Sequence, residues 1–372
     1  MPRREARVKS RTATALALLP VLAAALAGCG SSAPAGTAAT AGASGSASGS
    51  ADAATVADRL NTPWGVARMP DGALLVGSRD TGRILRIDPR TGERADVGTV
   101  PGVDAFVEGG LLGLALGPNG RLYAYYTGND DNRIVSFAYD PARPAGARLT
   151  DPRAVLSGIP KGDNHNGGRI AFGPDGMLYV GTGETGRTAL AQDRTSLGGK
   201  ILRITPDGAP APGNPFPGSP VYSLGHRNVQ GLAWDAQGRL WASEFGQDAW
   251  DELNLIRPGA NYGWPVVEGK AGRAGYTDPV VQWRPADASP SGIAFADGAI
   301  WMAGLRGQRL WRIPLNGDGT AGTPTAVLDH TAGRLRTVVA EPDGSLLVTT
   351  SNTDGRGDPR PGDDRILRHR PG

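Results

Sequence analysis

A repeated pattern of strands and turns runs from Trp64 to the C-terminus and limits the folds that this chain can adopt. Each copy holds a short apolar run, a turn ending in glycine and a second apolar run, and several continue into a third. The six turn glycines lie 46 to 62 residues apart: Gly72, Gly120, Gly176, Gly238, Gly298 and Gly344. Strand-based repeats of about this length are typical of β-propellers, in which each repeat forms one blade. The sequence therefore predicts an all-β chain, a six-bladed β-propeller of four-stranded antiparallel blades.

The first copy shows why these runs are expected to be strands. Its apolar segments 64–67 and 73–76 flank an Asp-Gly turn, and short apolar runs divided in this way are typical of hairpins. The third runs, such as 200–204, alternate apolar with basic residues, as half-buried strands do. Helical periodicity is absent from the sequence, and 56 glycines and 30 prolines would interrupt most helices. We expect residues 55–60 to complete the last blade and close the ring.

The N-terminal residues do not belong to this repeat. Five basic residues precede an apolar run, 15–27, which is too short to span a membrane and leads into Leu-Ala-Gly-Cys. This pattern predicts an export signal in residues 1–28. The Leu-Ala-Gly-Cys ending resembles a bacterial lipobox, in which Cys29, the sole cysteine, would be the lipidated residue. Residues 30–54 are nearly all Ala, Gly, Ser and Thr, so 29–54 is expected to be a flexible tether ahead of a propeller domain at 55–372. We therefore expect an exported protein, lipid-anchored to the bacterial cell membrane and facing outside the cytoplasm.

The net charge of +3 owes much to that signal. Residues 1–28 contain five of the 39 Lys and Arg and one of the 36 Asp and Glu, so the remainder carries 34 basic and 35 acidic residues, a formal charge of −1. This balance gives no reason to expect a nucleic-acid partner. The sequence also lacks a P-loop, a dinucleotide-binding glycine motif and a Cys/His cluster with zinc or haem spacing. A nicotinamide enzyme is therefore not expected.

Two loops, 163–169 and 225–231, break the uniformity of the repeat and precede inner strands of neighbouring blades. Loops in this position face the axial channel of a propeller. His165 lies between two asparagines and beside glycines that allow a ligand to approach, so it is suited to act as a general base. The alternative is a surface histidine hydrogen-bonded to a turn. For His226 in the second loop a structural role is favoured, because the next two residues, Arg and Asn, are the better donors to a ligand.

The two loops and three further segments resemble one known family. The matching segments are EGGLLGL (108–114), NHNGGR (164–169), GHRNVQGL (225–232), DELNLI (251–256) and GANYGWP (259–265). They are similar to segments of the soluble pyrroloquinoline-quinone (PQQ) sugar dehydrogenases, particularly the aldose sugar dehydrogenases. The resemblance extends from about Trp64 to Arg368. Such enzymes are six-bladed propellers, in agreement with the number of repeats.

The resemblance implies a role for the residues of both loops. His165 would remove the proton of the sugar hydroxyl while hydride passes to the quinone. Arg227 would stabilise the negative charge on the quinone oxygen, and Asn228 would hydrogen-bond the cofactor beside it; a structural ion pair is the alternative for Arg227. PQQ carries three carboxylates, so forked cationic groups are expected around it. The other positions that match cofactor-binding residues of the family are Glu108, Gln192, Tyr276, Arg306 and the closely spaced pair Arg334 and Arg336.

Calcium is implied at two places by the same resemblance. One ion would join the quinone to the main-chain carbonyls of Gly246 and Gln247. A second, structural ion would use Glu252 and the carbonyl of Tyr262. Without the resemblance, Asp251 and Glu252 are equally consistent with a solvated acidic pair.

The sequence departs from the family beside the expected base. Asn164 stands where the soluble glucose enzyme has an acid, so a carboxylate that would orient the imidazole is missing from that position. Asp163, one residue earlier, is the residue expected to serve instead. Glu108 likewise stands where some relatives have glutamine.

These observations lead to one hypothesis and two alternatives. The hypothesis is a PQQ- and calcium-dependent oxidation of aldose sugars at the anomeric hydroxyl to lactones, with the electrons passed to an external acceptor. The alternatives are a calcium-dependent lactonase-type hydrolase on a six-bladed propeller and a non-catalytic binding propeller tethered to the membrane. The hydrolase would need several inward-facing acidic ligands, whereas the matched loops offer Arg, Asn and His.

Overall fold

The structure is a computed structural model and describes residues 53–371. The predicted export signal, Cys29 and nearly all of the predicted tether lie outside the described residues. Within residues 53–371, no helix is both long and apolar enough to cross a membrane.

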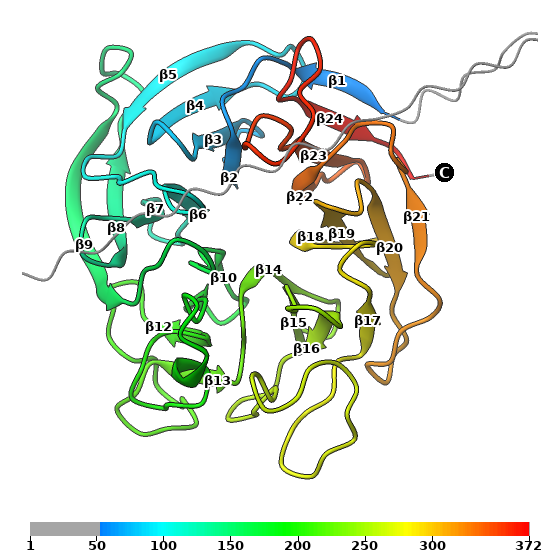
Figure 1. Cartoon of the computed structure of the whole chain (residues 1–372). Helices are drawn as coiled ribbons and strands as arrows, with labels where there is room; N and C mark the ends of the chain where they lie inside the picture. Colours follow the sequence, from blue (N-terminus) through cyan, green and yellow to red (C-terminus); the bar gives the residue numbers. More distant parts are fainter. Residues whose placement is uncertain (1–52, 372) are drawn as a thin grey trace, which may run out of the picture. The chain divides into compact units, whose positions relative to one another are not determined.

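Six four-stranded antiparallel sheets are arranged as the blades of a ring (Figure 1), which confirms the predicted six-bladed β-propeller. The first three blades are β2 (Pro63–Arg68), β3 (Leu74–Ser78), β4 (Arg83–Ile87) and β5 (Arg94–Thr99); β6 (Leu111–Leu116), β7 (Leu122–Thr127), β8 (Asn132–Tyr139) and β9 (Leu149–Ile159); and β10 (Ile170–Phe172), β11 (Leu178–Gly181), β12 (Lys200–Ile204) and β13 (Val221–Leu224). The last three are β14 (Val229–Trp234), β15 (Leu240–Glu244), β16 (Asp251–Leu255) and β17 (Val281–Trp283); β18 (Pro290–Ala296), β19 (Ala299–Gly304), β20 (Leu310–Pro314) and β21 (Thr325–Val327); and β22 (Leu335–Ala340), β23 (Leu346–Thr350), β24 (Ile366–His369) and β1 (Ala54–Ala57). One short 3-10 helix, η1 (Thr188–Ala191), interrupts the strands in the described part of the chain.

The ring is closed by the two ends of the described chain. Strand β1 pairs antiparallel with β24, with Ala54 opposite Arg368. Beyond this strand, the backbone N–H of Leu60 donates to the carbonyl of Asp364 at 2.8 Å, and the Leu60 side chain is buried. The expectation that residues 55–60 complete the last blade is therefore confirmed, with the strand itself ending at Ala57.

The glycines of the repeat are required by the turns that join the first two strands of each blade. All six turn glycines have φ between 66° and 87°, the left-handed region that residues with a Cβ rarely adopt. The register of the first hairpin, with Arg68 opposite Leu74, places such a turn directly after β2. The recurring glycine in the sequence therefore marks the same turn in every blade.

Close packing of the inner strands determines where loops meet. A Cβ on Gly65 of β2 would lie 2.3 Å from the carbonyl oxygen of Leu112, and one on Gly113 of β6 would lie 2.1 Å from that of Gly168. Glycine at these positions lets neighbouring inner strands approach backbone to backbone. The loops that precede the inner strands consequently converge near the axis of the ring (Figure 1).

Candidate active site

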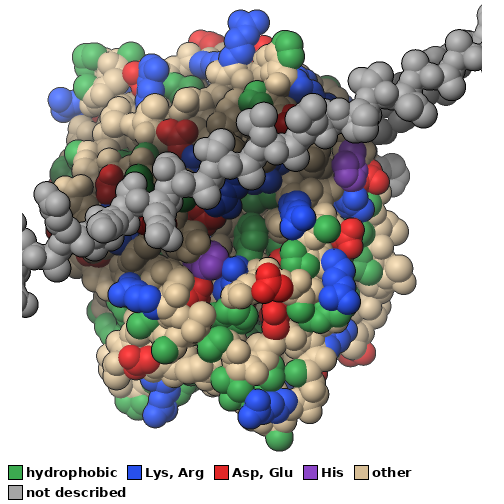
Figure 2. Space-filling view, viewed as in Figure 1, with side chains coloured by type: hydrophobic (Ala, Val, Ile, Leu, Met, Phe, Trp, Pro, Cys, Tyr) green, Lys and Arg blue, Asp and Glu red, His purple; other side chains and the backbone are tan. Residues whose placement is uncertain are grey.

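A cavity of about 450 Å³ lies where these loops converge, and residues from all six blades line it. Figure 2 shows the hollow near the axis, with basic side chains and a histidine at its edge. Nine of the residues that the sequence assigns to the base, the cofactor or calcium line this cavity: Glu108, His165, Arg227, Asn228, Gly246, Gln247, Arg306, Arg334 and Arg336. Four of the assigned residues do not: Gln192, Glu252, Tyr262 and Tyr276.

The loop before β10 holds His165 in an unusual backbone conformation. His165 has φ of 53°, in the left-handed region, where residues with side chains are strained. The buried side chain of Asn166 braces the loop, because its amide donates to the carbonyl of Gly162 at 2.8 Å and its oxygen accepts from the Gly162 N–H at 3.0 Å. A Cβ on Gly183 would lie 1.8 Å from the carbonyl oxygen of His165, so the glycine that follows β11 leaves room for this conformation.

The imidazole of His165 is oriented by Glu184. Its Nδ1 lies 2.5 Å from Oε1 of Glu184, and the side chains of His165 and Glu184 are only 15% and 1% exposed. The expected orienting residue, Asp163, is exposed, so that expectation is wrong. With Nδ1 held by a carboxylate, Nε2 is the nitrogen available to a ligand in the cavity.

Arg227 lies in the equivalent loop of the next blade. Its backbone N–H donates to Oε1 of Glu244, and its guanidinium lies 5.5 Å from the ring centre of Trp264. Burial lowers the pKa of Arg227, although Glu184 and Glu244 oppose this effect. The buried Nε of Arg227 has no hydrogen-bond partner among the described residues, so this guanidinium retains donor capacity for a ligand.

Asn228 and His226 have structural contacts. Oδ1 of Asn228 accepts from the backbone N–H of Gly167 at 2.9 Å, which joins the Arg227 loop to the His165 loop. His226 is fully buried, with Nδ1 2.7 Å from Glu244 and Nε2 2.8 Å from Ser223. The structural role favoured for His226 is therefore confirmed.

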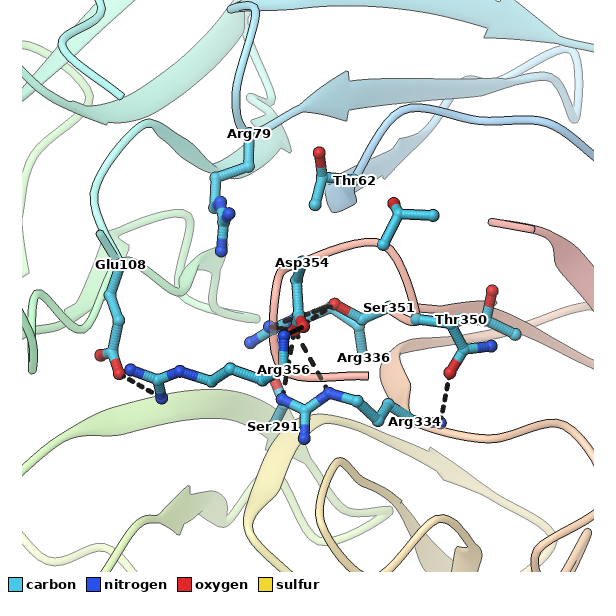
Figure 3. A network of polar contacts seen from close by, with 12 residues as sticks. Thr62, Arg79, Glu108, Ser291, Arg334, Arg336, Thr350, Ser351, Asp354 and Arg356 are labelled. Carbon is cyan, nitrogen blue, oxygen red and sulfur yellow. Dashed lines mark hydrogen bonds and ion pairs between the residues drawn. The ribbon is translucent and has the colours of Figure 1, made fainter. Parts of the chain in front are cut away.

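Arg334 and Arg336 share one carboxylate. Each places a guanidinium nitrogen 3.1 Å from Oδ2 of Asp354, as Figure 3 shows. Burial lowers the pKa of Arg336 to about 10, although Asp354 opposes the shift. Burial alone would raise the pKa of Asp354, but Arg336 and Arg334 lower it.

A second ion pair links two loops at the cavity. Arg356, in the loop between β23 and β24, lies 2.6 Å from Oε1 of Glu108, in the loop before β6 (Figure 3). Oε2 of Glu108 accepts from the backbone N–H of His165 at 3.0 Å. Glu108 therefore contacts the candidate base directly.

The cavity carries more cationic than anionic groups. Its guanidiniums are those of Arg79, Arg227, Arg306, Arg334, Arg336 and Arg356, and its carboxylates are those of Glu108, Asp251 and Asp354. Six positive charges against three negative ones favour an anionic ligand. Sequence reasoning did not identify Arg79, Asp354, Arg356 or Glu184, because single Arg, Asp and Glu residues carry no distinctive motif.

Gln192 and Tyr276 are not among the residues that line the cavity. Nε2 of Gln192 donates to the carbonyl of Trp264 at 2.7 Å, and its Oε1 accepts from Asn261 at 2.7 Å. A Cβ on Gly263 would lie 3.6 Å from atoms of Tyr276. Gln192 thus contacts the turn at 261–264, which carries the tryptophan beside Arg227, and Tyr276 lies near Gly263 of the same turn.

The residues expected to hold the first calcium ion line the cavity. The N–H of Gly246 donates to Oδ1 of Asp251 at 2.9 Å, and that of Gln247 donates to Glu268 at 2.7 Å. Oδ2 of Asp251 accepts from the N–H of Ser289 at 2.6 Å. These bonds order the segment whose carbonyls are the expected ligands. Carbonyl oxygens are ligands that a hard cation such as calcium prefers.

The residues expected to hold the second ion are buried. Burial and the neighbouring Glu244 raise the pKa of Glu252 to about 8. Oδ1 of Asn254, whose amide donates to Glu252 at 3.0 Å, is a buried oxygen without a partner among the described residues. A buried carboxylate beside an unpartnered amide oxygen fits a hard cation. The hydroxyl of Tyr262 is already bonded to Leu255, at 2.6 Å, so its carbonyl is the atom left to bind an ion.

Two further observations bear on metal binding. Asp251 and Glu252 are 1% and 7% exposed, so the alternative of a solvated acidic pair is wrong. Within residues 53–371, no three His, Cys, Asp or Glu side chains form a metal-binding cluster.

The fold and the site together define a β-propeller with an axial, arginine-rich cavity, lined by a histidine that a buried carboxylate holds in place. The chain belongs to the glucose/sorbosone dehydrogenase family, whose sequence model, described as Glucose / Sorbosone dehydrogenase, matches residues 60–367. This match confirms the family resemblance drawn from the motifs. The chain is therefore an enzyme of the oxidoreductase class.

Relatives of known name and structure agree with this membership. The solved PQQ-bound form of the aldose sugar dehydrogenase from Streptomyces coelicolor is 63% identical, with a TM-score of 0.83 over 85% of this chain and 96% of that one. The aldose sugar dehydrogenase YliI of Escherichia coli is 29% identical over 333 residues, 80% of this chain and 89% of that protein. Quinoprotein glucose dehydrogenase B of Acinetobacter calcoaceticus is 34% identical over 263 residues, 60% of this chain and 54% of that protein.

Proposed function

We propose that this protein oxidises aldose sugars at the anomeric hydroxyl to lactones, using PQQ and calcium and passing the electrons to an external acceptor. The observation that carries the proposal is the convergence of six arginines and His165, whose ring is held from behind by Glu184, in one cavity. The PQQ-bound relative from Streptomyces coelicolor supports the choice of cofactor. When bound, PQQ supplies the two-electron acceptor to which the hydride of the sugar carbon passes.

The residues of the cavity fit a planar tricarboxylate. Forked guanidiniums bind carboxylates through paired, charge-assisted hydrogen bonds, and the pair Arg334 and Arg336 presents two of them side by side. Arg306 adds a third at the cavity wall, and Trp64 offers a flat apolar surface. We assign binding of the cofactor to these residues, with Glu108, Gln192, Asn228 and Tyr276 as supporting positions.

The chain's own residues then divide the chemistry between them. His165 takes the proton of the sugar hydroxyl at Nε2, since Nδ1 is held by Glu184. The carboxylate of Glu184 fixes the tautomer of the ring and stabilises the imidazolium that forms. Arg227 provides positive charge beside the reacting atoms, where negative charge develops.

Calcium is assigned to two positions. One ion would be held by the carbonyls of Gly246 and Gln247 at the cavity wall, where it would polarise the cofactor. The other would be held by Glu252 and the carbonyl of Tyr262, where it would compensate the buried carboxylates.

The cavity favours this proposal over the two alternatives. A calcium-dependent hydrolase needs inward acidic ligands, but Asp354 is engaged by two arginines and Glu108 by Arg356. Asp251 accepts from two backbone N–H groups. A non-catalytic propeller would give no reason for a buried carboxylate aimed at a strained histidine.

We further propose that the protein acts outside the cytoplasm. Residues 1–28 would direct export, Cys29 would carry the lipid, and 29–54 would join it to the propeller at 55–372. The basic head, the short apolar run and the Leu-Ala-Gly-Cys motif support this proposal.

Reconstitution tests the proposal directly. Apo-protein would be mixed with PQQ, calcium or both, and dye reduction by several aldoses would be followed. We expect turnover with both additions and a loss of roughly a hundred-fold or more in His165→Ala. His330→Ala, a change at an exposed histidine outside the cavity, is the matched control and should keep full activity. Absence of PQQ binding would contradict the proposal, and binding without aldose turnover would contradict the substrate class.

A further inference from the structure

Arg169, the last residue of the NHNGGR segment, is buried one layer below the cavity. Its Nε donates to the carbonyl of Gln230 at 2.7 Å, and Nη2 donates to Oγ1 of Thr337 at 3.1 Å. Its guanidinium carbon lies 4.3 Å from the ring centre of Trp64, the distance of a cation–π contact. Trp64 lines the cavity and Arg169 does not, so the tryptophan separates this cation from the ligand space.

The positive charge of Arg169 is not compensated locally. Its contacts are a carbonyl, a hydroxyl and an indole ring, and no carboxylate pairs with it anywhere in residues 53–371. Burial, and then the like charge of Arg336, lower the pKa of Arg169 to about 9. Burying an unpaired charge destabilises a folded chain, so this arginine lowers the stability of the apo-protein.

The surrounding residues nevertheless accommodate the guanidinium. A Cβ on Gly292 of β18 would lie 3.1 Å from Nη2 of Arg169, so glycine leaves the space that the cation occupies. Thr337, which accepts from Arg169, itself donates to the carbonyl of Trp64 at 2.7 Å. Arg169 is thus connected to Trp64 both through the ring face and through this hydroxyl.

Trp64 also has a second cation near it. The guanidinium carbon of Arg336 lies 5.8 Å from the ring centre, and Arg336 lines the cavity. Nη1 of Arg336 donates to Oε1 of Gln230 at 3.1 Å, while the carbonyl of the same glutamine accepts from Arg169. One residue therefore connects the cation below the cavity to a cation at its wall.

We propose that Arg169 is a positioning residue for the anionic ligand: it holds Trp64 and Arg336 in place and adds positive potential to the floor of the cavity. The proposal rests on the proposed function, because the bound tricarboxylate supplies the missing negative charge. A charge that destabilises the apo-protein would then strengthen binding, a trade between stability and function.

The test compares Arg169→Gln and Arg169→Lys with the wild type, without using turnover. PQQ affinity would be measured by calorimetry, and the Tm of the apo-protein by thermal unfolding. We expect Arg169→Gln to weaken PQQ binding roughly ten- to hundred-fold, as the loss of one charge across a few ångströms of protein implies, while the apo Tm stays the same or rises. Arg169→Lys, which keeps the charge, should recover most of the affinity.

A matched control separates this effect from the loss of any arginine. Arg203 also stacks on an aromatic ring, Tyr179, but it is paired with Asp175 and lies outside the cavity. Arg203→Gln should leave PQQ affinity unchanged. An unchanged affinity in Arg169→Gln, or a joint loss of affinity and apo Tm that lysine does not restore, would overturn the proposal.

A failure of the proposed function can be distinguished from a failure of the role proposed for Arg169. If wild type does not bind PQQ, a benzene tricarboxylate serves as the probe of the same positive cavity. Weaker binding of that probe in Arg169→Gln than in wild type would support the role of Arg169 on its own. Equal binding in both, or no binding to wild type, would overturn it.

Discussion

The proposed chemistry of this cavity depends on one ring nitrogen of His165. Glu184 occupies the other nitrogen from a position with 1% side-chain exposure, where water does not compete for the hydrogen bond. The backbone of the same histidine is held by Glu108 and shows a positive φ. Two carboxylates from separate loops thus fix the position of the proposed base before any substrate arrives.

The first prediction concerns Glu184. Glu184→Gln removes the charge that stabilises the imidazolium, so kcat should fall by about a hundred- to ten-thousand-fold, the usual contribution of acid–base catalysis. PQQ affinity should change little, because Glu184 does not line the cavity. Steady-state kinetics with calorimetric affinities would measure both.

The control for this prediction is Asp163→Asn. Asp163 is exposed and was the orienting residue expected from the sequence, so its substitution should leave kcat within about two-fold of wild type, as changes at exposed positions commonly do. A larger effect at Asp163 than at Glu184 would contradict the geometry described above.

The pair formed by His165 and Glu184 shows how much of this site could be predicted from the sequence. His165 and Arg227 lie in distinctive motifs, and both reach the cavity. Glu184 comes from a different loop, 19 residues along the chain. Its role depends on how the loop after β11 packs against the loop before β10, which no local pattern records. Asp354 and Arg356 in the last blade were missed for the same reason.

Among the elements, β12 departs from its sequence pattern at one residue. Its alternation of apolar and basic residues predicts a half-buried strand, yet Lys200 is fully buried. Nζ donates to the carbonyls of Leu190, Ala191 and Gly198, at 2.6, 3.1 and 2.7 Å. The lysine therefore satisfies the carbonyls around η1, and alternation alone could not distinguish this role from a solvent-facing one.

The second prediction follows from that burial, which lowers the pKa of Lys200 from 10.5 to about 8. Because the pKa in the folded state lies below that of the unfolded chain, the unfolded chain holds the additional proton between these two values. The free energy of unfolding of wild type, relative to Lys200→Met, should therefore rise by roughly 2–3 kcal/mol from pH 8 to 10.5. Chemical denaturation across this range is the measurement.

Lys270→Met provides the comparison for the pH series. Lys270 is exposed, so its substitution should give a difference from wild type that does not vary with pH. A flat difference for Lys200→Met as well would show that Lys200 titrates normally.

At the scale of the whole molecule, stability depends on the seam between β1 and β24. The third prediction is that Leu60→Ala lowers the free energy of unfolding by about 2–4 kcal/mol, the usual cost of removing a buried leucine side chain. Because Arg334 and Arg336 are carried by the blade that this seam closes, PQQ affinity should fall with it. Arg59→Ala, at a side chain that is 80% exposed, should change neither quantity.

The fourth prediction concerns the attachment of the whole chain. If Cys29 is lipidated, Cys29→Ser should move the protein from the membrane fraction to the soluble fraction and remove the added mass of the lipid. Activity of the purified propeller should be unchanged. Recovery of wild type in the soluble fraction, without added mass, would contradict the anchor.

The overall architecture could be predicted almost completely from the sequence. Each blade needs a left-handed turn, and glycine meets that need at low conformational cost, so the fold leaves a regular signal along the chain. The closing strand was also predictable, because the last copy lacks a fourth run of its own. Contacts between blades, such as Gly113 against Gly168, leave no comparable signal.

The pairing of Ala54 with Arg368 places the two ends of the described chain on adjacent strands. A short peptide could therefore join them, and a cut at a turn in another blade would produce a circular permutant with the same six sheets. In such a chain β24 and β1 would form a continuous hairpin. Fraying of the new termini would then affect a different blade and spare the one that carries the paired arginines.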